Sequence, residues 1–144
     1  MENFRRIFVD SNYFVALFNE KDSLYAQAQT VADLLDMQSS VLVISNFVFL
    51  EVVTVLAQRR GKSVSKAAGS YLLNTARIEF VHIDSTLQQD SWNTFQSVSS
   101  KNISFVDCST IAVMKAEGIR TLLTFDFNDF RALQRRFYFT LFNF

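Results

Sequence analysis

Short apolar runs alternate along the chain with longer segments of helical periodicity. The apolar runs are typical of buried β-strands, because they are short and bounded by polar or turn-forming residues. The predicted strands are 6–10, 41–45, 78–83, 120–124 and 137–144. The predicted helices are 12–17, 22–36, 47–60, 64–75, 85–97, 105–117 and 128–133. This alternation predicts an α/β domain with a parallel sheet and helices on both faces.

Two of the predicted helices show the periodicity most clearly. The core-facing positions of helix 22–36 are Leu24, Ala28, Val31 and Leu35. The predicted core contacts of helix 85–97 are Leu87, Trp92 and Phe95. Both segments therefore pack one face against the sheet or against a neighbouring helix.

Length and composition agree with one globular unit. The 144 residues predict a single domain over 1–144, and 49% apolar against 19% charged residues supply a full core. The formal net charge is zero, which argues against a protein that binds nucleic acid chiefly through a basic surface. Cys108 and His82 are the single residues of their kinds, which excludes an intrachain disulfide and any site that needs two histidines. We expect Cys108 to be a small buried residue and His82 to be structural.

No segment has the features of a secretion signal or of a membrane span. The first residues lack a hydrophobic signal core. The longest apolar run, 46–57, is well short of the ~20 residues that a transmembrane helix needs, and Glu51 interrupts it. We therefore expect a cytoplasmic protein that does not associate with membranes.

Four acidic residues stand between apolar neighbours: Asp10, Glu51, Asp107 and Asp126. A carboxylate in such surroundings is costly to bury unless it is paired or binds a metal. Asp10 and Asp126 follow predicted strands, whereas Glu51 and Asp107 lie near the starts of predicted helices. Ligands of parallel α/β sheets bind beyond the carboxyl ends of the strands, so we expect the four acids to converge there. Each acid taken alone is also compatible with a helix cap or a surface ion pair.

Four converging carboxylates repel one another unless a cation neutralises them. Mg²⁺ and Mn²⁺ prefer oxygen ligands, and one or two such ions activate water and stabilise the leaving oxygen in phosphodiester hydrolysis. The pattern of acids therefore predicts a Mg²⁺- or Mn²⁺-dependent nuclease.

The acid positions recur within longer motifs. The motifs are FVDSN at 8–12, Glu51, SFVD at 104–107 and LLTFDFNDF at 122–130. In this order, over nearly the whole chain, they resemble the PIN-domain family. These proteins are small metal-dependent ribonucleases, best represented by VapC-type toxins of toxin–antitoxin pairs. The resemblance implies a parallel sheet of four or five strands flanked by helices on both faces.

The same resemblance implies a set of roles. The implied metal ligands are Asp10, Glu51, Asp107 and Asp126. Asn12 and Thr124 are implied to support the site, and Asp129 is an alternative to Asp126 as the fourth acid. The implied partners are an RNA substrate, a small antitoxin and a second copy of the chain. One departure is Tyr25, which stands where many relatives carry a histidine.

Basic and aromatic clusters allow two interpretations each. Arg59, Arg60 and Lys62 lie at a helix end, where they either complement the helix dipole or contact the RNA backbone. The aromatic segment 137–144 either stacks on bases or, as we favour, forms an inner strand or a dimer contact.

Three functions are compatible with these features. The first is a metal-dependent endoribonuclease, the toxin of a toxin–antitoxin pair. The second is a non-catalytic PIN-like module that binds RNA or protein. The third is phosphoryl transfer through an aspartyl-phosphate at Asp10, which is disfavoured because Asn12 occupies the position of the usual second aspartate.

Overall fold

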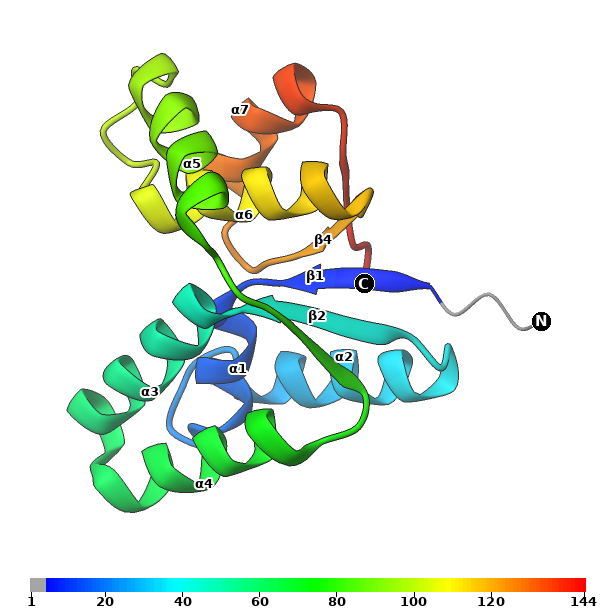
Figure 1. The fold of residues 1–144 in the computed structure, drawn as a ribbon. Coiled ribbons are helices and arrows are strands. Elements are labelled where there is room, and N and C mark those ends of the chain that lie inside the picture. Colours follow the sequence, from blue (N-terminus) through cyan, green and yellow to red (C-terminus); the bar gives the residue numbers. More distant parts are fainter. Residues whose placement is uncertain (1–4) are drawn as a thin grey trace.

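Five apolar segments form one parallel sheet in the computed structural model, which describes residues 5–144 (Figure 1). The strands are β1 (Arg6–Val9), β2 (Val41–Ser45), β3 (Ile78–Val81), β4 (Thr121–Leu123) and β5 (Thr140–Leu141). Their order is β3-β2-β1-β4-β5, and every neighbouring pair is parallel. The first residues of the predicted 1–144 domain, 1–4, lie outside the described residues.

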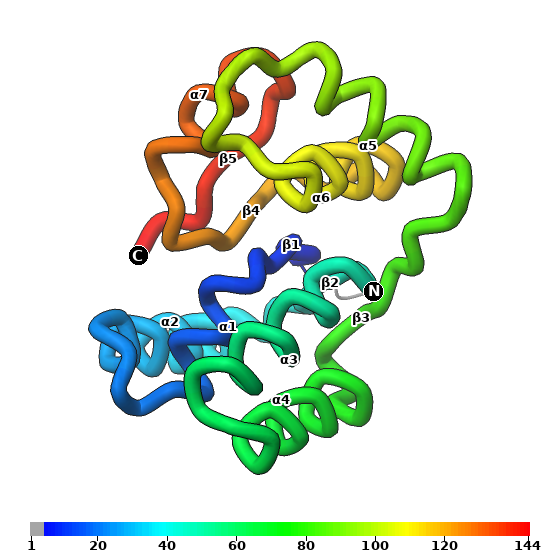
Figure 2. Tube along the Cα trace, turned by 90° about the vertical axis from the view of Figure 1, so that its left-hand side faces the viewer, coloured from blue at the N-terminus to red at the C-terminus, as the bar shows by residue number. Residues whose placement is uncertain are grey.

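Helices cover both faces of this sheet, as Figures 1 and 2 show. One face is covered by α1 (Ser11–Leu17), α2 (Tyr25–Met37), α3 (Asn46–Arg60) and α4 (Lys62–Asn74). The other face is covered by α5 (Ser85–Ser97), α6 (Phe105–Glu117) and α7 (Phe127–Phe137). The predicted α/β class, with helices on both faces of a parallel sheet, is confirmed.

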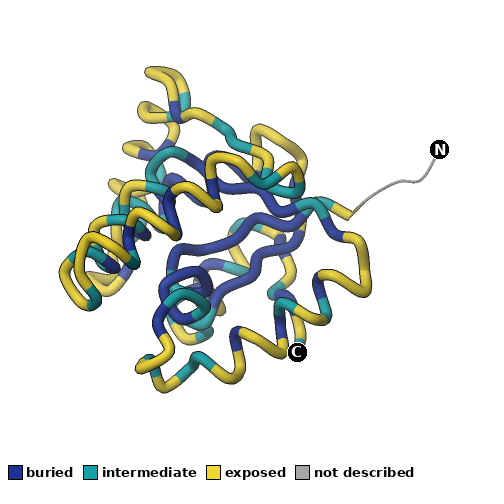
Figure 3. Tube along the Cα trace, turned by 90° about the horizontal axis from the view of Figure 1, so that it is seen from below, coloured by how far each residue is buried: buried dark blue, intermediate teal, exposed yellow. Residues whose placement is uncertain are grey.

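The central strands form the most continuous buried part of the chain (Figure 3). Ile7, Phe8 and Val9 of β1 are all fully buried. Since successive strand residues point to opposite faces, β1 must be covered on both sides, and this explains its unbroken apolar run.

The direction in which successive strands are added to the sheet reverses at β1. The chain moves outward from β1 through β2 to β3 and then returns to place β4 on the other side of β1. The backbone N–H of Asp10 donates to the carbonyl oxygen of Leu123 at 2.9 Å, so the ends of β1 and β4 are tied together. In open α/β sheets this switch point is where ligands bind.

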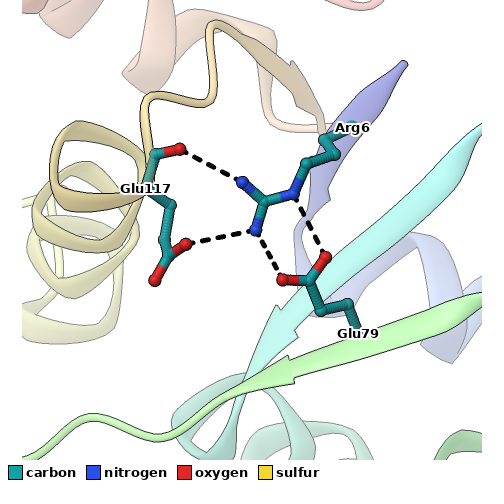
Figure 4. Close-up of polar contacts among 3 residues, drawn as sticks. All are labelled: Arg6, Glu79 and Glu117. Atoms are coloured by element: carbon teal, nitrogen blue, oxygen red, sulfur yellow. Dashed lines mark hydrogen bonds and ion pairs between the residues drawn. The ribbon is translucent and has the colours of Figure 1, made fainter. Parts of the chain in front are cut away.

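At the opposite end of β1, Arg6 joins three elements (Figure 4). Its guanidinium donates to both carboxylate oxygens of Glu79 on β3, at 3.1 and 2.6 Å, and reaches across β2 to do so. It also donates to the Glu117 carboxylate at the end of α6, at 3.2 Å. These partly exposed contacts connect α6, in the helical layer on one face, to β3 at the edge of the sheet.

The segment after residue 126 differs from the prediction. The predicted helix 128–133 extends over 127–137 and ends at Tyr138, whose φ of 56° is left-handed. The predicted strand 137–144 shrinks to β5, and it is an edge strand, not an inner one. Phe137 follows Phe130 and Leu133 at helical spacing, so it completes the apolar face of α7.

The predicted core face of α5 is partly wrong. Leu87 packs against the core, but Trp92 and Phe95 are 45% and 38% exposed. The buried position is Ser91, whose hydroxyl donates to the carbonyl oxygen of Leu87 at 2.6 Å. A small residue allows α5 to approach its neighbour closely, and the two large rings stack on each other at its edge.

No helix within residues 5–144 combines the length and the apolar character that crossing a bilayer requires.

Candidate metal and nuclease site

Asp10 lies at the end of β1 and caps the start of α1. Its side chain is only 6% exposed, and both carboxylate oxygens accept hydrogen bonds. The backbone N–H of Ser11 donates to Oδ1 at 2.8 Å, and the hydroxyl of Thr124 donates to Oδ2 at 2.8 Å. Asp10 is therefore held in one orientation at the switch point.

Thr124 follows β4 and connects several groups of the site. Its hydroxyl oxygen accepts hydrogen bonds from the Asn12 side-chain amide at 3.1 Å and from the backbone N–H of Asp126 at 3.0 Å. The amide oxygen of Asn12 in turn accepts from the backbone N–H of Phe125 at 3.1 Å. The structure thus brings Asn12 and Thr124 beside Asp10, and they fix the loop after β4 to α1.

Glu51 reaches this region from α3. Its Oε1 accepts a hydrogen bond from the hydroxyl of Ser11 at 3.0 Å. Ser11 therefore touches two acids, because its backbone binds Asp10 and its side chain binds Glu51. Ser11 was not among the residues predicted to form the site, although its position directly after the strand-end acid is a signal in the sequence.

Asp107 lies in the first turn of α6 and forms a capping box with Ser104. Its carboxylate accepts from the backbone N–H of Ser104 at 2.9 Å, and its own N–H donates to the hydroxyl of Ser104 at 3.1 Å. The helix-cap interpretation is correct for this residue, and it coexists with proximity to the other acids.

The acids share one electrostatic environment. Burial, followed by the negative charge of Asp107, raises the pKa of Asp10 to about 7, although hydrogen bonds from Thr124 and Ser11 act in the opposite direction. Burial is also the main cause that raises the pKa of Asp107, and the charges of Asp126 and Glu51 add to it. Each carboxylate therefore makes ionisation of its neighbours less favourable.

Asp126 and Asp129 stand together at the start of α7. Asp126 is the residue before the helix, and within residues 5–144 its side chain makes no capping hydrogen bond. A hydrogen bond with the Asp126 carboxyl is the main cause that raises the pKa of Asp129. The charge of Asp126 also contributes to the raised pKa of Asp107, so Asp126 lies near enough to act on that carboxylate.

The donor set suits a hydrated divalent cation. Within residues 5–144, no three carboxylate, imidazole or thiol groups lie close enough together to hold an ion as they stand. However, Mg²⁺ usually keeps several waters and takes only one or two protein carboxylates. A buried carboxylate with raised pKa, surrounded by further acids and hydroxyl groups, matches that requirement.

The predicted RNA-contacting cations lie away from the acids. Arg59 is in the last turn of α3, roughly 12 Å along the helix axis from Glu51 at ~1.5 Å per residue. Arg60 lies 3.9 Å from the Glu20 carboxylate. Lys62 lines a cavity of about 690 Å³ between α3 and α4. The structure does not bring these three residues to the acid site.

Cys108 and His82 do not form a nucleophilic pair. Cys108 is fully buried, and burial followed by the charge of Asp107 raises the pKa of its thiol to about 11. His82 is exposed after β3 and stacks on Phe80 with ring centroids 5.6 Å apart. A thiolate mechanism therefore has no support in this geometry.

Comparison with known proteins identifies the family of the chain. A family model for the PIN domain matches residues 7–135. The chain belongs to the PIN-domain family. This confirms the resemblance drawn from the motifs around Asp10, Glu51, Asp107 and Asp126.

Relatives refine that placement. The PIN-domain chain is 33% identical over 127 residues to the 23S rRNA-specific endonuclease VapC20 of Mycobacterium tuberculosis, which covers 88% of this chain and 92% of VapC20. The crystal structure of VapC20, described as a sarcin–ricin loop cleaving toxin, superposes with a TM-score of 0.77 at 29% identity. That match covers 88% of this chain and 94% of the other.

More distant structures share the fold. VapBC2 of Rickettsia felis, bound to a DNA fragment from its promoter, matches with a TM-score of 0.65 at 16% identity, over 96% of this chain and 98% of the other. FitAcB of Neisseria gonorrhoeae matches with a TM-score of 0.64 at 15% identity, over 95% of this chain and 96% of the other. At these identities the likeness concerns architecture alone.

Proposed function

We propose that this PIN-domain protein is a divalent-metal-dependent endoribonuclease and the toxin of a toxin–antitoxin pair. The observation that carries the proposal is the environment of Asp10. A buried carboxylate held by Thr124 and Ser11, and exposed to the charges of Asp107 and Glu51, is unfavourable without a cation. Such an arrangement is typical of a metal site.

The proposed ligands are Asp10, Glu51, Asp107 and Asp126. A bound Mg²⁺ or Mn²⁺ would activate water for attack on the phosphodiester and stabilise charge on the leaving oxygen. Ser11 orients Glu51 through its hydroxyl and Asp10 through its backbone N–H. Thr124 orients Asp10 and, through its contact with the N–H of Asp126, also the start of α7. Support of this kind holds metal-binding side chains in place.

The proposed substrate is an exposed loop of ribosomal RNA. The named activity of VapC20 supports this substrate class. Unpaired loop nucleotides can be splayed away from their neighbours, so that a scissile phosphate reaches a recessed acidic site. Contacts of Arg59, Arg60 and Lys62 with the RNA backbone remain a prediction, as does Asp129 as a substitute for Asp126.

The proposed protein partners are a small antitoxin and a second copy of the chain. The description of VapC20 as a toxin supports an antitoxin partner. Exposed apolar side chains on α3 and α5, namely Leu50, Trp92 and Phe95, support association with another protein surface. The homodimer, a cytoplasmic location and a domain that spans all of 1–144 remain predictions.

The decisive experiment is cleavage of a labelled ribosomal RNA hairpin. Wild-type protein should cleave it with Mn²⁺ or Mg²⁺ and stop when EDTA is added. Asp10→Asn and Asp107→Asn, purified identically, should abolish cleavage, whereas Asp84→Asn at the start of α5 should not. Cleavage by Asp10→Asn at the wild-type rate would refute the proposal. RNA binding that neither needs metal nor leads to cleavage would favour a non-catalytic binding module.

A further inference from the structure

The pairing of β5 with β4 determines where the residues after both strands lie. Thr140 pairs with Thr121 and Leu141 with Leu122, and the backbone N–H of Phe142 donates to the carbonyl oxygen of Leu122 at 2.7 Å. Because the strands are parallel, the two chains leave the sheet in the same direction. Continuing this register by three residues places Phe144 beside Phe125.

The side chain of Phe144 contacts both rings that flank Asp126. Its ring lies edge-on to Phe125 with centroids 5.5 Å apart, and it lies 5.8 Å from Phe127. Phe142 also stacks on Phe144, with ring centroids 6.2 Å apart. Phe125 also contacts Tyr13 of α1 at 6.1 Å. The ring of Phe144 thus contacts the residue before Asp126 and the residue after it.

Asp126 has few other constraints. Its φ of −96° and ψ of 74° belong neither to the preceding strand nor to the helix that follows. Its backbone N–H is anchored to Thr124, and its carboxyl group hydrogen-bonds Asp129 but makes no capping bond within residues 5–144. Asp129 is itself partly exposed, so the direction of the Asp126 carboxylate also depends on how the backbone at Phe125 and Phe127 is held.

We infer that Phe144 is a positioning residue for the Asp126 carboxylate. By holding the rings of Phe125 and Phe127 together, it orients the intervening residue toward Asp107. The inference rests on the proposed function, because it takes Asp126 as a metal ligand. It adds that the affinity for the metal depends on a side chain that touches neither the ion nor any of the other acids.

The test compares Mn²⁺ affinity by titration calorimetry in wild-type protein and five variants. Phe144→Ala should weaken binding about 10-fold or more, as loss of supporting contacts does at metal sites. Phe144→Tyr keeps the ring and should bind like wild type. The matched control is Phe80→Ala at the opposite edge of the sheet, where another half-buried ring contacts Phe49 and His82. In an Asp126→Asn background, Phe144→Ala should have no further effect on affinity.

Unchanged Mn²⁺ affinity in Phe144→Ala would overturn the inference, as would an equal loss in Phe80→Ala. Failure of the wild-type protein to bind Mn²⁺ would count against the proposed function alone. In that event a measurement without metal tests the role of Phe144. Amide hydrogen exchange at Asp126 should accelerate at least 10-fold in Phe144→Ala and stay unchanged in Phe80→Ala. Equal exchange at Asp126 in wild type and Phe144→Ala would again overturn the inference.

Discussion

The hydroxyl of Thr124 donates a 2.8 Å hydrogen bond to Oδ2 of Asp10, and it joins residues that are 114 positions apart. Both side chains are buried, with 1% and 6% of their surface exposed. This contact connects the central strand of the sheet to the loop that carries Asp126. The position of the Asp10 carboxylate therefore depends on the neutral side chain of Thr124.

Thr124→Val removes that hydroxyl and keeps the shape of the side chain. We expect a loss of about 1–3 kcal/mol in the free energy of unfolding, because Asp10 and Asn12 lose a buried partner. Urea denaturation measures this loss, and Thr124→Ser should recover most of it. Thr110→Val is a matched control, since the buried Thr110 hydroxyl has no partner among the described residues. An equal loss at both positions would contradict the prediction.

The stability of the metal-free protein should fall as pH rises from about 4 to about 7. The folded pKa of Asp10 is about 7, whereas an unfolded aspartate titrates near 3.9. Within this window the folded state binds more protons than the unfolded state, so deprotonation favours unfolding. We expect Asp10→Asn to lose this dependence when unfolding is measured in urea with EDTA at about pH 5 and about pH 8. Identical pH profiles for the two proteins would disprove this assignment.

Mn²⁺ should raise the thermal unfolding temperature of wild-type protein but not that of Asp107→Asn. A ligand that binds only the folded state stabilises it by mass action. Without metal, the variant should be at least as stable as wild type, because it removes a carboxylate charge and keeps an oxygen that can accept from the N–H of Ser104. Asp84→Asn also changes a helix-capping acid, at the start of α5, and should respond to Mn²⁺ like wild type. A full Mn²⁺ response in Asp107→Asn would exclude this residue as a ligand.

If Arg59 and Lys62 contact RNA, Arg59→Gln with Lys62→Gln should weaken binding and reduce its salt dependence. The slope of log affinity against log salt should fall by about 0.7 for each lost contact with single-stranded phosphate. Filter binding in EDTA measures affinity without cleavage. Arg120→Gln, directly before β4 and at the end of the strand away from the acid site, serves as the control. A slope equal to that of wild type would contradict the predicted RNA contacts and leave Arg59 with its role at the carboxyl end of α3.

Cys108 should resist alkylation in the folded protein at about pH 8. The thiol is buried and its pKa is raised to about 11, so only roughly one molecule in a thousand carries the thiolate. Iodoacetamide labelling followed by mass spectrometry should show reaction only after urea is added. Rapid labelling of native protein would mean that α6 opens readily beside Asp107.

The sheet and the acid positions followed from the sequence for a physical reason. A strand that is covered on both faces reads as an unbroken apolar run, so an acid at its end is conspicuous, as at Asp10. The capping box of Asp107 also lies in local sequence. Such features need only neighbouring residues to be recognised.

Other features depend on contacts between distant segments and were not predictable locally. The bond of Ser11 to Glu51 and the contact of Phe144 with Phe125 exist only once the sheet order is fixed. Trp92 and Ser91 are adjacent on α5, so periodicity alone did not tell which of them faces the core. Packing selected the smaller residue, because it permits a closer approach of the helices.

The pairing of β4 with β1 also determines when the acid site can assemble during translation. Asp10 is made early, whereas Thr124 and Asp126 are among the last residues that the site needs. In a nascent polypeptide that ends before β4, the central strand is paired on one side only, and Thr124 and Asp126 are missing from the acid site. A ribosome that synthesises this chain therefore carries no assembled acid site until β4 and the loop after it have left the exit tunnel.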